Sequence, residues 1–397
     1  MALVDLFLSF NKKDIQLSVV NVEHGIRGDE SLRDSEFVKN YCQTHGLPLF
    51  FKSFDSLAYA KENSLSVEQA ARELRLGFFR SLITDGKTDY VAFAHHLDDV
   101  CETVLMRTFR GTGVDGLVGI KQSDIFLRPL LGVTRKQIDD YVKENNIPFI
   151  EDSTNADSAY SRNFLRNEIL PRIEQRWDYR KGILTLTKNA AEVVELLDSL
   201  SIKPERVDFD AYALDLNELE KLPKAVKKHS IRRAVALLNG GVDFERSNLE
   251  CVLDLLTKRN GASLDLAGGV KVWKEYDKLT FERSIPFDDR EIPFNVGTLK
   301  FDTQKWTIVE RTDERLRFDL SKIPKNAVIR GMKDGDVFCK FGGFTKPLGD
   351  FYTDKKVPLR LRRRLPVIAS DNEILVTVFE ISEKVKVDRG GYTIKKL

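Results

Sequence analysis

Residues 90–103 read Tyr-Val-Ala-Phe-Ala-His-His-Leu-Asp-Asp-Val-Cys-Glu-Thr, and they indicate the fold class of the first half of the chain. Its first five residues form a short apolar run, which is typical of a strand buried on both faces of a parallel sheet. The pair Asp98 and Asp99 then predicts the start of a helix, because acidic side chains stabilise the positive end of a helix. A buried strand that leads directly into a helix indicates an α/β domain.

The same alternation of strands and helices continues on both sides of this stretch, through about the first 190 residues. Apolar runs predict further strands at 16–22 and 47–54. Apolar residues at helical spacing predict helices at 2–10, 31–45, 67–82 and 134–145. We therefore expect a parallel-sheet α/β domain over residues 1–195.

The pattern changes after residue 195. Two helices and then three short strands are predicted, at 224–238, 246–258, 263–266, 270–274 and 278–282. The last third of the chain is rich in strand-like runs separated by glycine-containing turns. We expect an α+β linker domain at 196–310 and a small β-rich domain at 311–397.

Composition excludes several classes of protein. With 42% hydrophobic and 31% charged residues, the 397-residue chain has the make-up of a globular protein of two or three domains. No apolar run approaches the ~20 residues that span a bilayer, and the first ten residues do not resemble a signal peptide, so we expect a cytoplasmic protein. The four cysteines are widely spaced, which predicts reduced thiols and disfavours zinc sites, iron–sulfur sites and sulfur transfer.

Three polar side chains are predicted to meet where the strand at 90–94 gives way to its helix. Asp99 and Glu102 lie one helical turn apart, and His95 joins them if the turn is tight. This is the edge at which open α/β sheets bind ligands. Carboxylates there can hold Mg²⁺ with substrate phosphates, or orient an amine nucleophile. A helix cap is the alternative interpretation, and for Asp98 alone we predict that role.

Other candidates each have a plain alternative. His24 follows a predicted strand and belongs to the same sheet edge as His95, although a lone histidine there is more often a surface residue. Arg72 and Arg75 flank the apolar stripe of their helix, either as side chains with their stems on the core or as guanidinium groups that face phosphate. Arg162 and Arg166 lie one turn apart, which fits either a surface helix or a phosphate contact. The glycines between 111 and 119 do not follow a strand, so they predict turns rather than a phosphate loop.

A basic cluster near the C-terminus is the candidate nucleic-acid interface. Residues 330–397 contain 15 Lys+Arg against 9 Asp+Glu, a net charge of +6, whereas the rest of the chain carries 48 against 52, a net of −4. Six basic residues fall within ten positions, with aromatic residues before them: Lys355, Lys356, Arg360, Arg362, Arg363 and Arg364. Such a cluster is either a solvated face or a surface that binds RNA.

Segments that carry these candidates resemble one family. They read Asn-Val-Glu-His-Gly-Ile-Arg-Gly (21–28), His-His-Leu-Asp-Asp-Val-Cys-Glu-Thr (95–103), Arg-Gly-Thr-Gly-Val-Asp-Gly-Leu (110–117) and Glu-Asp-Ser-Thr-Asn (151–155) followed by Arg-Asn-Phe-Leu-Arg (162–166). Their order and spacing resemble the tRNA(Ile)-lysidine synthetase family, a PP-loop branch of the N-type ATP pyrophosphatases with an adenine nucleotide α-hydrolase-like fold. Residues 71–79 and 330–380 resemble further motifs of the same family.

The resemblance implies a reaction, its co-substrates and its site. Bacterial enzymes of this family adenylate C2 of the wobble cytidine of tRNA(Ile) with a CAU anticodon; free L-lysine then displaces AMP, which changes decoding from AUG to AUA. ATP, Mg²⁺, L-lysine and tRNA(Ile) are thus the expected ligands, while the existence of a homodimer stays open. The implied catalytic residues are His95, Asp99, Glu102 and Arg75. Asp99 is also the expected Mg²⁺ ligand. The implied ATP- or substrate-binding residues are His24, Arg72, Arg162 and Arg166, and the cluster at 355–364 is expected to bind tRNA.

One motif of the family is not in these 397 residues. Family members open with a strand and a phosphate loop, Ser-Gly-Gly-x-Asp-Ser, whereas Met1-Ala-Leu-Val-Asp-Leu-Phe-Leu reads as the helix that follows that loop. We expect a recognisable but gapped sheet, lost ATP affinity with tRNA binding kept, and a poor enzyme unless the loop precedes Met1. The alternatives are a non-catalytic tRNA-binding remnant and another PP-loop tRNA-modifying enzyme.

Overall fold

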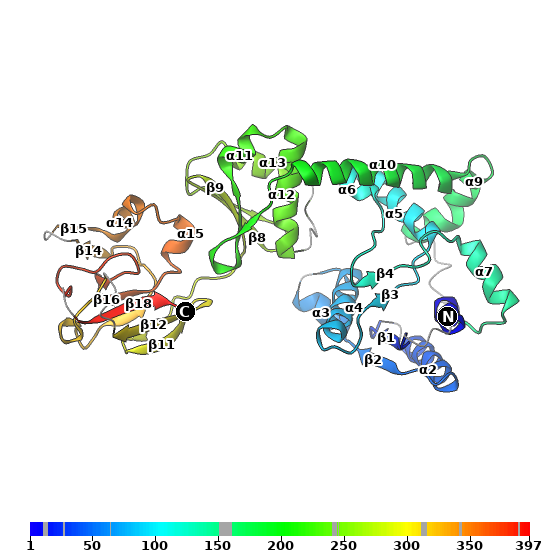
Figure 1. Ribbon diagram of the computed structural model, residues 1–397, viewed down its shortest axis with the longest axis horizontal. Helices are drawn as coiled ribbons and strands as arrows, with labels where there is room; N and C mark the ends of the chain where they lie inside the picture. The colour runs from blue at the N-terminus through cyan, green and yellow to red at the C-terminus, as the bar shows by residue number, and fades with distance from the viewer. Residues whose placement is uncertain are drawn as a thin grey trace. The chain divides into compact units, whose positions relative to one another are not determined.

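The computed structural model describes residues 1–10, 15–26, 28–63, 65–150, 161–239, 244, 246–310, 316–340, 344–387 and 390–397. The chain forms two compact units, Met1–Glu195 and Leu196–Leu397 (Figure 1). The motif at 151–155 lies outside the described residues. None of the helices in the described part of the chain is long and apolar enough to cross a membrane.

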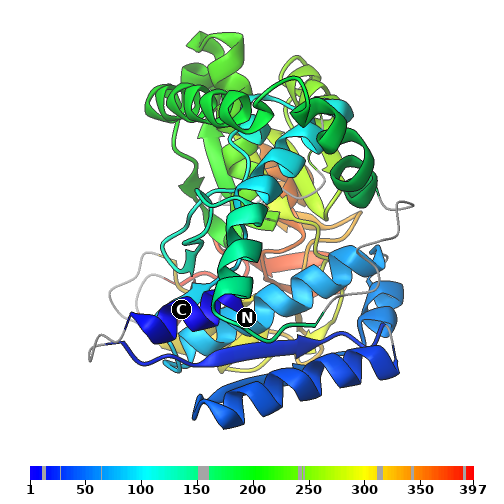
Figure 2. The ribbon, with the colours of Figure 1, turned by 90° about the vertical axis from the view of Figure 1, so that its right-hand side faces the viewer.

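The strands of unit 1 form two separate parallel pairs. Strand β1 (Val19–Glu23) pairs with β2 (Leu49–Ser53), and β3 (Val91–Ala92) pairs with β4 (Phe126–Leu127). Within the described residues the two pairs are not hydrogen-bonded to each other, which is the arrangement expected of a gapped sheet. Helix α2 (Asp29–Thr44) lies along β1, as Figure 2 shows.

The helices of unit 1 begin where the sequence offers caps. Ser66 with Gln69, and Thr134 with Gln137, form reciprocal capping boxes at the starts of α4 and α7. Besides α2, the helices are α1 (Ala2–Ser9), α3 (Ser56–Glu62), α4 (Val67–Thr84), α5 (Leu97–Arg110), α6 (Val114–Leu117), α7 (Arg135–Glu144), α8 (Ser161–Phe164), a π-helical turn (Leu165–Ile169), α9 (Leu170–Glu174) and α10 (Tyr179–Leu200).

Helix α5 is fixed from its apolar side. Leu97, Val100, Cys101 and Val104 are buried against Ile183 of α10. These residues recur at helical spacing, so one face of α5 is packed while the carboxylates of its first turns are held in place. Burial raises the pKa of the Cys101 thiol to about 12, which makes it a packing residue rather than a nucleophile.

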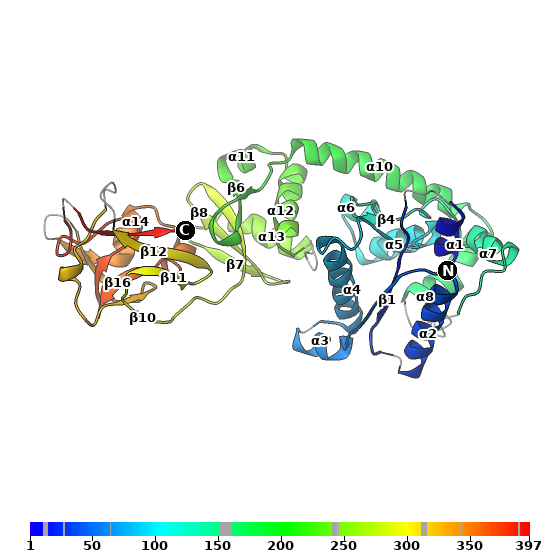
Figure 3. The same ribbon diagram turned by 60° about the horizontal axis from the view of Figure 1, so that its bottom comes forward.

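Unit 2 opens with an antiparallel sheet in the order β5-β6-β9-β8-β7. Its strands are β5 (Glu205–Arg206), β6 (Tyr212–Asp215), β7 (Ser263–Leu266), β8 (Val270–Glu275) and β9 (Lys278–Arg283). The helices of this region are α11 (Leu216–Lys221), α12 (Lys224–Asn239) and α13 (Arg246–Leu255). Helices α12 and α13 pack on the sheet (Figure 3). The strands at 263, 270 and 278 begin where the sequence predicts them.

The rest of unit 2 is β-rich. A mixed sheet has the order β10-β13-β16-β17-β14-β15, and β11-β12-β18 form a second sheet (Figure 1). The bounds are β10 (Ile292–Pro293), β11 (Gly297–Phe301), β12 (Gln304–Glu310), β13 (Val328–Arg330), β14 (Val337–Cys339), β15 (Thr345–Pro347), β16 (Val367–Ser370), β17 (Glu373–Val376) and β18 (Tyr392–Lys396). Helices α14 (Leu348–Asp354) and α15 (Leu359–Arg362) cover this core.

Candidate active site

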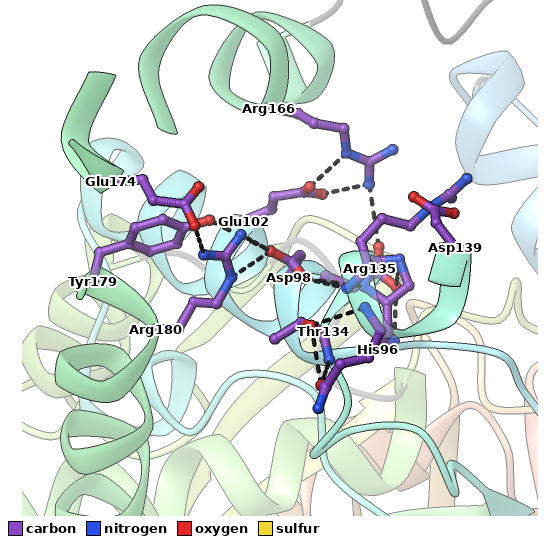
Figure 4. Close-up of polar contacts among 12 residues, drawn as sticks. His96, Asp98, Glu102, Thr134, Arg135, Asp139, Arg166, Glu174, Tyr179 and Arg180 are labelled. Carbon is purple, nitrogen blue, oxygen red and sulfur yellow. Dashed lines mark hydrogen bonds and ion pairs between the residues drawn. The ribbon is translucent and has the colours of Figure 1, made fainter. Parts of the chain in front are cut away.

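The first turn of α5 carries two aspartates with different roles. Asp99 accepts the backbone N–H of His96 at 2.9 Å and so caps its own helix. Asp98 instead accepts the backbone N–H of Arg135, the first residue of α7, at 2.7 Å and the Nε–H of Arg180 at 2.7 Å (Figure 4). The prediction that Asp98 caps α5 is therefore wrong: its side chain turns away from the α5 amides and joins α7 and α10.

Two arginines close over the carboxylates of Asp99 and Glu102. Arg162 donates from Nε to Glu102 Oε2 at 2.6 Å and from Nη2 to Asp99 Oδ1 at 2.8 Å. Arg166 donates from Nε to Glu102 Oε1 at 2.6 Å and from Nη2 to Glu102 Oε2 at 2.8 Å and Asp99 Oδ1 at 3.3 Å. The structure thus brings together four of the side chains that the sequence singles out.

Because the two carboxylates are buried, the stability of this cluster depends on the balance between its negative and positive charges. Glu102 is 0% exposed and Asp99 is 8% exposed. A buried carboxylate is unfavourable unless cations and hydrogen bonds compensate it, and here two guanidinium groups face two carboxylates. The hydrogen bond to Glu102 raises the pKa of Arg166, so this arginine stays charged.

The backbone at Arg162 and Arg166 explains why both reach the same target. Arg162 lies on α8, and Arg166 lies in the π-helical turn that follows it. Residues four apart lie on the same side of a helix, so both side chains can point to α5. Such π-helical turns occur frequently at functional sites.

Both histidines at the start of α5 are held neutral. His95 stacks on Phe93, with ring centroids 5.5 Å apart, and its buried Nδ1 has no hydrogen-bond partner among the described residues. His96 lies with Nε2 3.4 Å from Asp99 Oδ2 and Nδ1 3.8 Å from Asp98 Oδ2. Burial is the main cause that lowers the pKa of each ring, which favours the neutral imidazole with a single ring proton.

His24, Arg75 and His95 share one edge of unit 1. His24 contacts Ser56 through Nδ1 at 3.1 Å. Burial and, next, the positive charge of Arg75 lower the pKa of His24; burial chiefly lowers that of His95, and Arg75 contributes there too. Burial and the charge of Arg72 lower the pKa of Arg75 itself. These predicted site residues are therefore close enough to interact electrostatically: His24 follows β1, His95 follows β3, and Arg75 lies in the middle of α4.

A pocket of about 360 Å³ opens beside the carboxylates, and Figure 4 shows the side chains around it. Its charged and aromatic lining consists of His96, Asp98, Glu102, Arg135, Arg166, Glu174, Tyr179 and Arg180. Burial alone would raise the pKa of Asp98, but its hydrogen bonds to the Arg135 amide and Arg180 hold it below the usual value. Nothing local in the sequence connects Arg135, Tyr179 and Arg180 to α5, so these three residues were not predicted. His96 had a signal in its doublet with His95.

The donor set around Asp99 does not fit a metal ion. Oδ1 accepts two guanidinium groups, and Oδ2 accepts a backbone amide. Over the described ranges, no three His, Cys, Asp or Glu side chains gather as metal ligands. The expectation that Asp99 holds Mg²⁺ is therefore not supported by this geometry.

The basic cluster of unit 2 divides into buried and exposed members. Arg360 is 2% exposed and donates to Asp208 at 2.9 Å and Glu275 at 3.1 Å. Arg364 is 3% exposed and donates to Asp302 at 3.1 Å. The prediction that these two arginines face tRNA needs correction, because both are enclosed in unit 2 by carboxylates.

The other members are nearer the surface. Arg362 donates to the carbonyls of Val357 and Gly349, both at 3.1 Å. Arg363 is exposed and pairs with Asp289 at 2.8 Å, and Lys355 pairs with Glu380 at 2.9 Å. Lys356 is exposed. A tRNA contact by these four residues stays a prediction.

Comparison with known proteins agrees with the fold of unit 1. Residues 1–173 match a family model described as a PP-loop domain, so unit 1 belongs to the PP-loop class of ATP-binding domains. Over 97% of its length the chain is 32% identical to the tRNA(Ile)-lysidine synthase of Caldanaerobacter subterraneus subsp. tengcongensis, of which it covers 87%. It is 30% identical to the tRNA(Ile)-lysidine synthase of Clostridium tetani, with 97% and 88% covered.

The chain belongs to the tRNA(Ile)-lysidine synthase family, a family of ligases. The resemblance predicted from its motifs is confirmed, and neither alternative, the non-catalytic remnant or another modifying enzyme, is favoured. Among solved structures, the tRNA thiolase NcsA from Methanococcus maripaludis is similar at a TM-score of 0.40 and 15% identity, over 49% of this chain and 68% of that chain. That likeness is too low to bear on function.

Proposed function

We propose that this protein ligates free L-lysine to C2 of the wobble cytidine of tRNA(Ile) with a CAU anticodon, at the expense of ATP. Membership of the tRNA(Ile)-lysidine synthase family supports the reaction. The observation that carries the assignment to residues is Glu102, a fully buried carboxylate at the ligand edge of a PP-loop domain, held by two arginines.

The reaction divides into two steps whose needs differ. First, the C2 oxygen of the cytidine attacks the α-phosphorus of ATP, and pyrophosphate leaves. Then an amine of lysine attacks C2, the C2–oxygen bond breaks, and AMP leaves with that oxygen. Before it attacks, the ammonium group of lysine must lose one proton to free the nitrogen lone pair, and the nitrogen must be held in line with C2. Carboxylates meet both needs, because they accept hydrogen bonds from an ammonium group and can take its proton.

Asp99 and Glu102 are the carboxylates proposed for this role. They lie on one side of α5, and their oxygens already accept N–H donors from cationic groups. The ammonium group of lysine also carries positively charged N–H donors, and it is smaller than a guanidinium group. We propose that it replaces part of the contact made by Arg162 and Arg166, and that the freed guanidinium groups turn to the charge of the departing phosphate.

The pocket beside α5 is the proposed site of the rest of the lysine molecule. Its volume of about 360 Å³ lies at the lower end of the range for small-molecule sites, about 300–1,000 Å³. A free amino acid carries both charges, and the lining supplies both partners. We propose that Arg135, an exposed side chain that pairs with Asp139, binds its α-carboxylate, and that Glu174, which pairs with Arg180 through Oε1, binds its α-amino group.

The proposal is tested by the identity of the substrates. The family's Ser-Gly-Gly-x-Asp-Ser motif is not among the 397 residues. The assay therefore uses two proteins: the 397-residue chain, and a loop-extended chain in which that segment of a relative precedes Met1. Labelled lysine should enter a tRNA(Ile) transcript with the CAU anticodon in an ATP-dependent manner, in the loop-extended chain. A transcript with uridine in place of the wobble cytidine is the matched control. Equal incorporation into both transcripts, or none into either, would contradict the proposal.

A further inference from the structure

We propose that four arginines of unit 1 form a phosphate-binding track that holds the RNA backbone beside the wobble base. The members of this arginine track are Arg72, Arg75, Arg107 and Arg128. The inference rests on the proposed function, because it takes the ligand to be the RNA substrate. It adds two residues, Arg107 and Arg128, to which neither the sequence motifs nor the relatives assign a role.

The four side chains come from elements that meet: α4 packs on β3 and β4 through Phe79, and Arg107 and Arg128 both donate to carbonyls of the segment 116–121. Arg72 and Arg75 lie one turn apart on α4, Arg107 lies in the last turn of α5, and Arg128 follows β4. Burial is the first cause that lowers the pKa of Arg75, Arg107 and Arg128, and repulsion by Arg72 is the second cause in each case. One cation therefore acts on all three of the others.

No carboxylate balances this charge in the described part of the chain. Arg107 donates only to carbonyls, those of Gly116 and Gly119, both at 3.0 Å. Arg128 likewise donates to the carbonyls of Lys121 and Phe126, at 2.6 Å and 3.1 Å.

Two donors of the track are buried and unused. The Nε–H groups of Arg75 and Arg128 have no hydrogen-bond partner among the described residues. Other arginines of unit 1, such as Arg162 and Arg180, are paired with aspartate or glutamate. Converging like charges with unsatisfied donors are unfavourable unless a bound anion supplies the missing partner. Guanidinium groups suit phosphate in particular, because their forked donors match its oxygens.

The track leads to the active site and is held rigidly there. The Arg128 guanidinium lies over the ring of Phe93, 5.3 Å from its centroid, and Phe93 stacks on His95. The carbonyl contacts of Arg107 and Arg128 fix both side chains before any ligand binds. Such preorganisation lowers the entropy cost of binding.

The exposure of the track favours a polynucleotide over ATP. Arg75 and Arg128 are half-buried and Arg72 is exposed; Arg107 is exposed as a whole residue, while its guanidinium contact with the Gly119 carbonyl is partly buried. The row of positive charges thus continues from the site to the surface. The phosphates of a single bound nucleotide are compact and would not contact all four arginines. An RNA strand presents one phosphate after another along its length, and each can be neutralised by one arginine.

The test measures the binding of a stem–loop RNA that carries the CAU anticodon to the 397-residue chain, by fluorescence anisotropy over a range of salt concentrations. The double variant Arg107→Gln/Arg128→Gln should bind about tenfold more weakly at low salt. The slope of log affinity against log salt should fall by about 0.7–0.9 for each lost contact. Arg72→Gln, which alters an exposed side chain, should lower the slope by one such step without a change in thermal stability. Arg33→Gln is the matched control, because Arg33 is exposed and pairs with Asp34 at 3.4 Å.

Two outcomes would overturn the track. One is an unchanged salt slope in both Arg72→Gln and the double variant while the wild-type chain binds the stem–loop. The other is displacement of the stem–loop from the wild-type chain by ATP–Mg²⁺ in simple competition, which would assign the arginines to the nucleotide. A wild-type chain that does not distinguish this stem–loop from one with an unrelated anticodon would instead count against the proposed function.

Discussion

Arg166 holds Glu102 with a two-point contact: Nε donates to Oε1 at 2.6 Å, and Nη2 donates to Oε2 at 2.8 Å. The two parallel hydrogen bonds use the fork of the guanidinium group, which a lysine cannot reproduce. This contact joins the π-helical turn at 165–169 to the buried face of α5. It also places a cation at the proposed entry of the lysine amine.

Arg166→Lys tests whether this fork matters for the reaction. The variant keeps the charge but loses one hydrogen bond, so Glu102 is held less rigidly. We expect lysidine formation by the loop-extended chain to fall by about tenfold or more, since small misplacements of catalytic groups cost about 10²-fold. Arg172→Lys, an exposed arginine on α9, is the control and should be neutral. Equal rates for the two variants would leave the fork without a catalytic role.

Asp98→Asn tests the corrected role of this residue as a structural partner. Asp98 and Arg180 are largely buried, with side-chain exposures of 9% and 22% and a closest N–O distance of 2.6 Å. Breaking a buried pair costs about 3–5 kcal/mol, so the free energy of unfolding in urea should fall by about 3 kcal/mol. Asp139→Asn breaks the exposed pair with Arg135, at 60% and 45% exposure, and should cost about 0–1 kcal/mol. A loss for Asp98→Asn as small as this control would refute the structural role.

In unit 2, two arginines of the basic cluster offer the same comparison between a buried and an exposed ion pair. Arg360→Ala would leave Glu275 buried without its cation, with an expected loss of about 3–5 kcal/mol of unfolding free energy. Arg363→Ala breaks an ion pair whose side chains are 51% and 73% exposed and should cost about 0–1 kcal/mol. Weaker tRNA binding by Arg360→Ala at unchanged stability would show that Arg360 contacts tRNA rather than stabilising unit 2.

Stability should depend on pH through the buried histidines. Burial lowers the pKa of His24, His95 and His96 from their ordinary value near 6.5. Below about pH 6.5 the unfolded chain therefore binds more protons than the folded protein, and the free energy of unfolding falls as the pH falls. Urea unfolding between about pH 7 and pH 5 should show this decline, and His96→Gln should make it shallower. A decline of equal steepness in the variant would exclude His96 as a cause.

Local patterns in the sequence predicted the elements of the fold well. Apolar spacing and capping residues placed α4, α7 and α12 within two residues of their observed ends, because their signals lie inside the elements themselves. The convergence of Asp99 and Glu102 followed in the same way from helical spacing.

Contacts between distant segments were not predictable in this way. Arg180 reaches Asp98 across 82 residues, and Arg360 reaches Asp208 across 152 residues. A run of basic residues such as 360–364 does not reveal which side chains turn inward, because that depends on carboxylates supplied by other strands. The sequence therefore identified Asp99, Glu102, Arg162 and Arg166 as charged groups of the site, but not Arg135 and Arg180 beside them.

Nucleoside mass spectrometry of tRNA(Ile) after incubation with ATP and L-lysine measures whether the buried carboxylates of α5 carry out lysine transfer. The loop-extended chain should form lysidine and release one AMP for each lysidine. Glu102→Gln and Asp99→Asn should each lower the rate by about 10²- to 10⁴-fold, with tRNA binding retained. The exposed control Glu144→Gln should match the wild type. Near-wild-type rates in both carboxylate variants, with folding intact, would contradict the account.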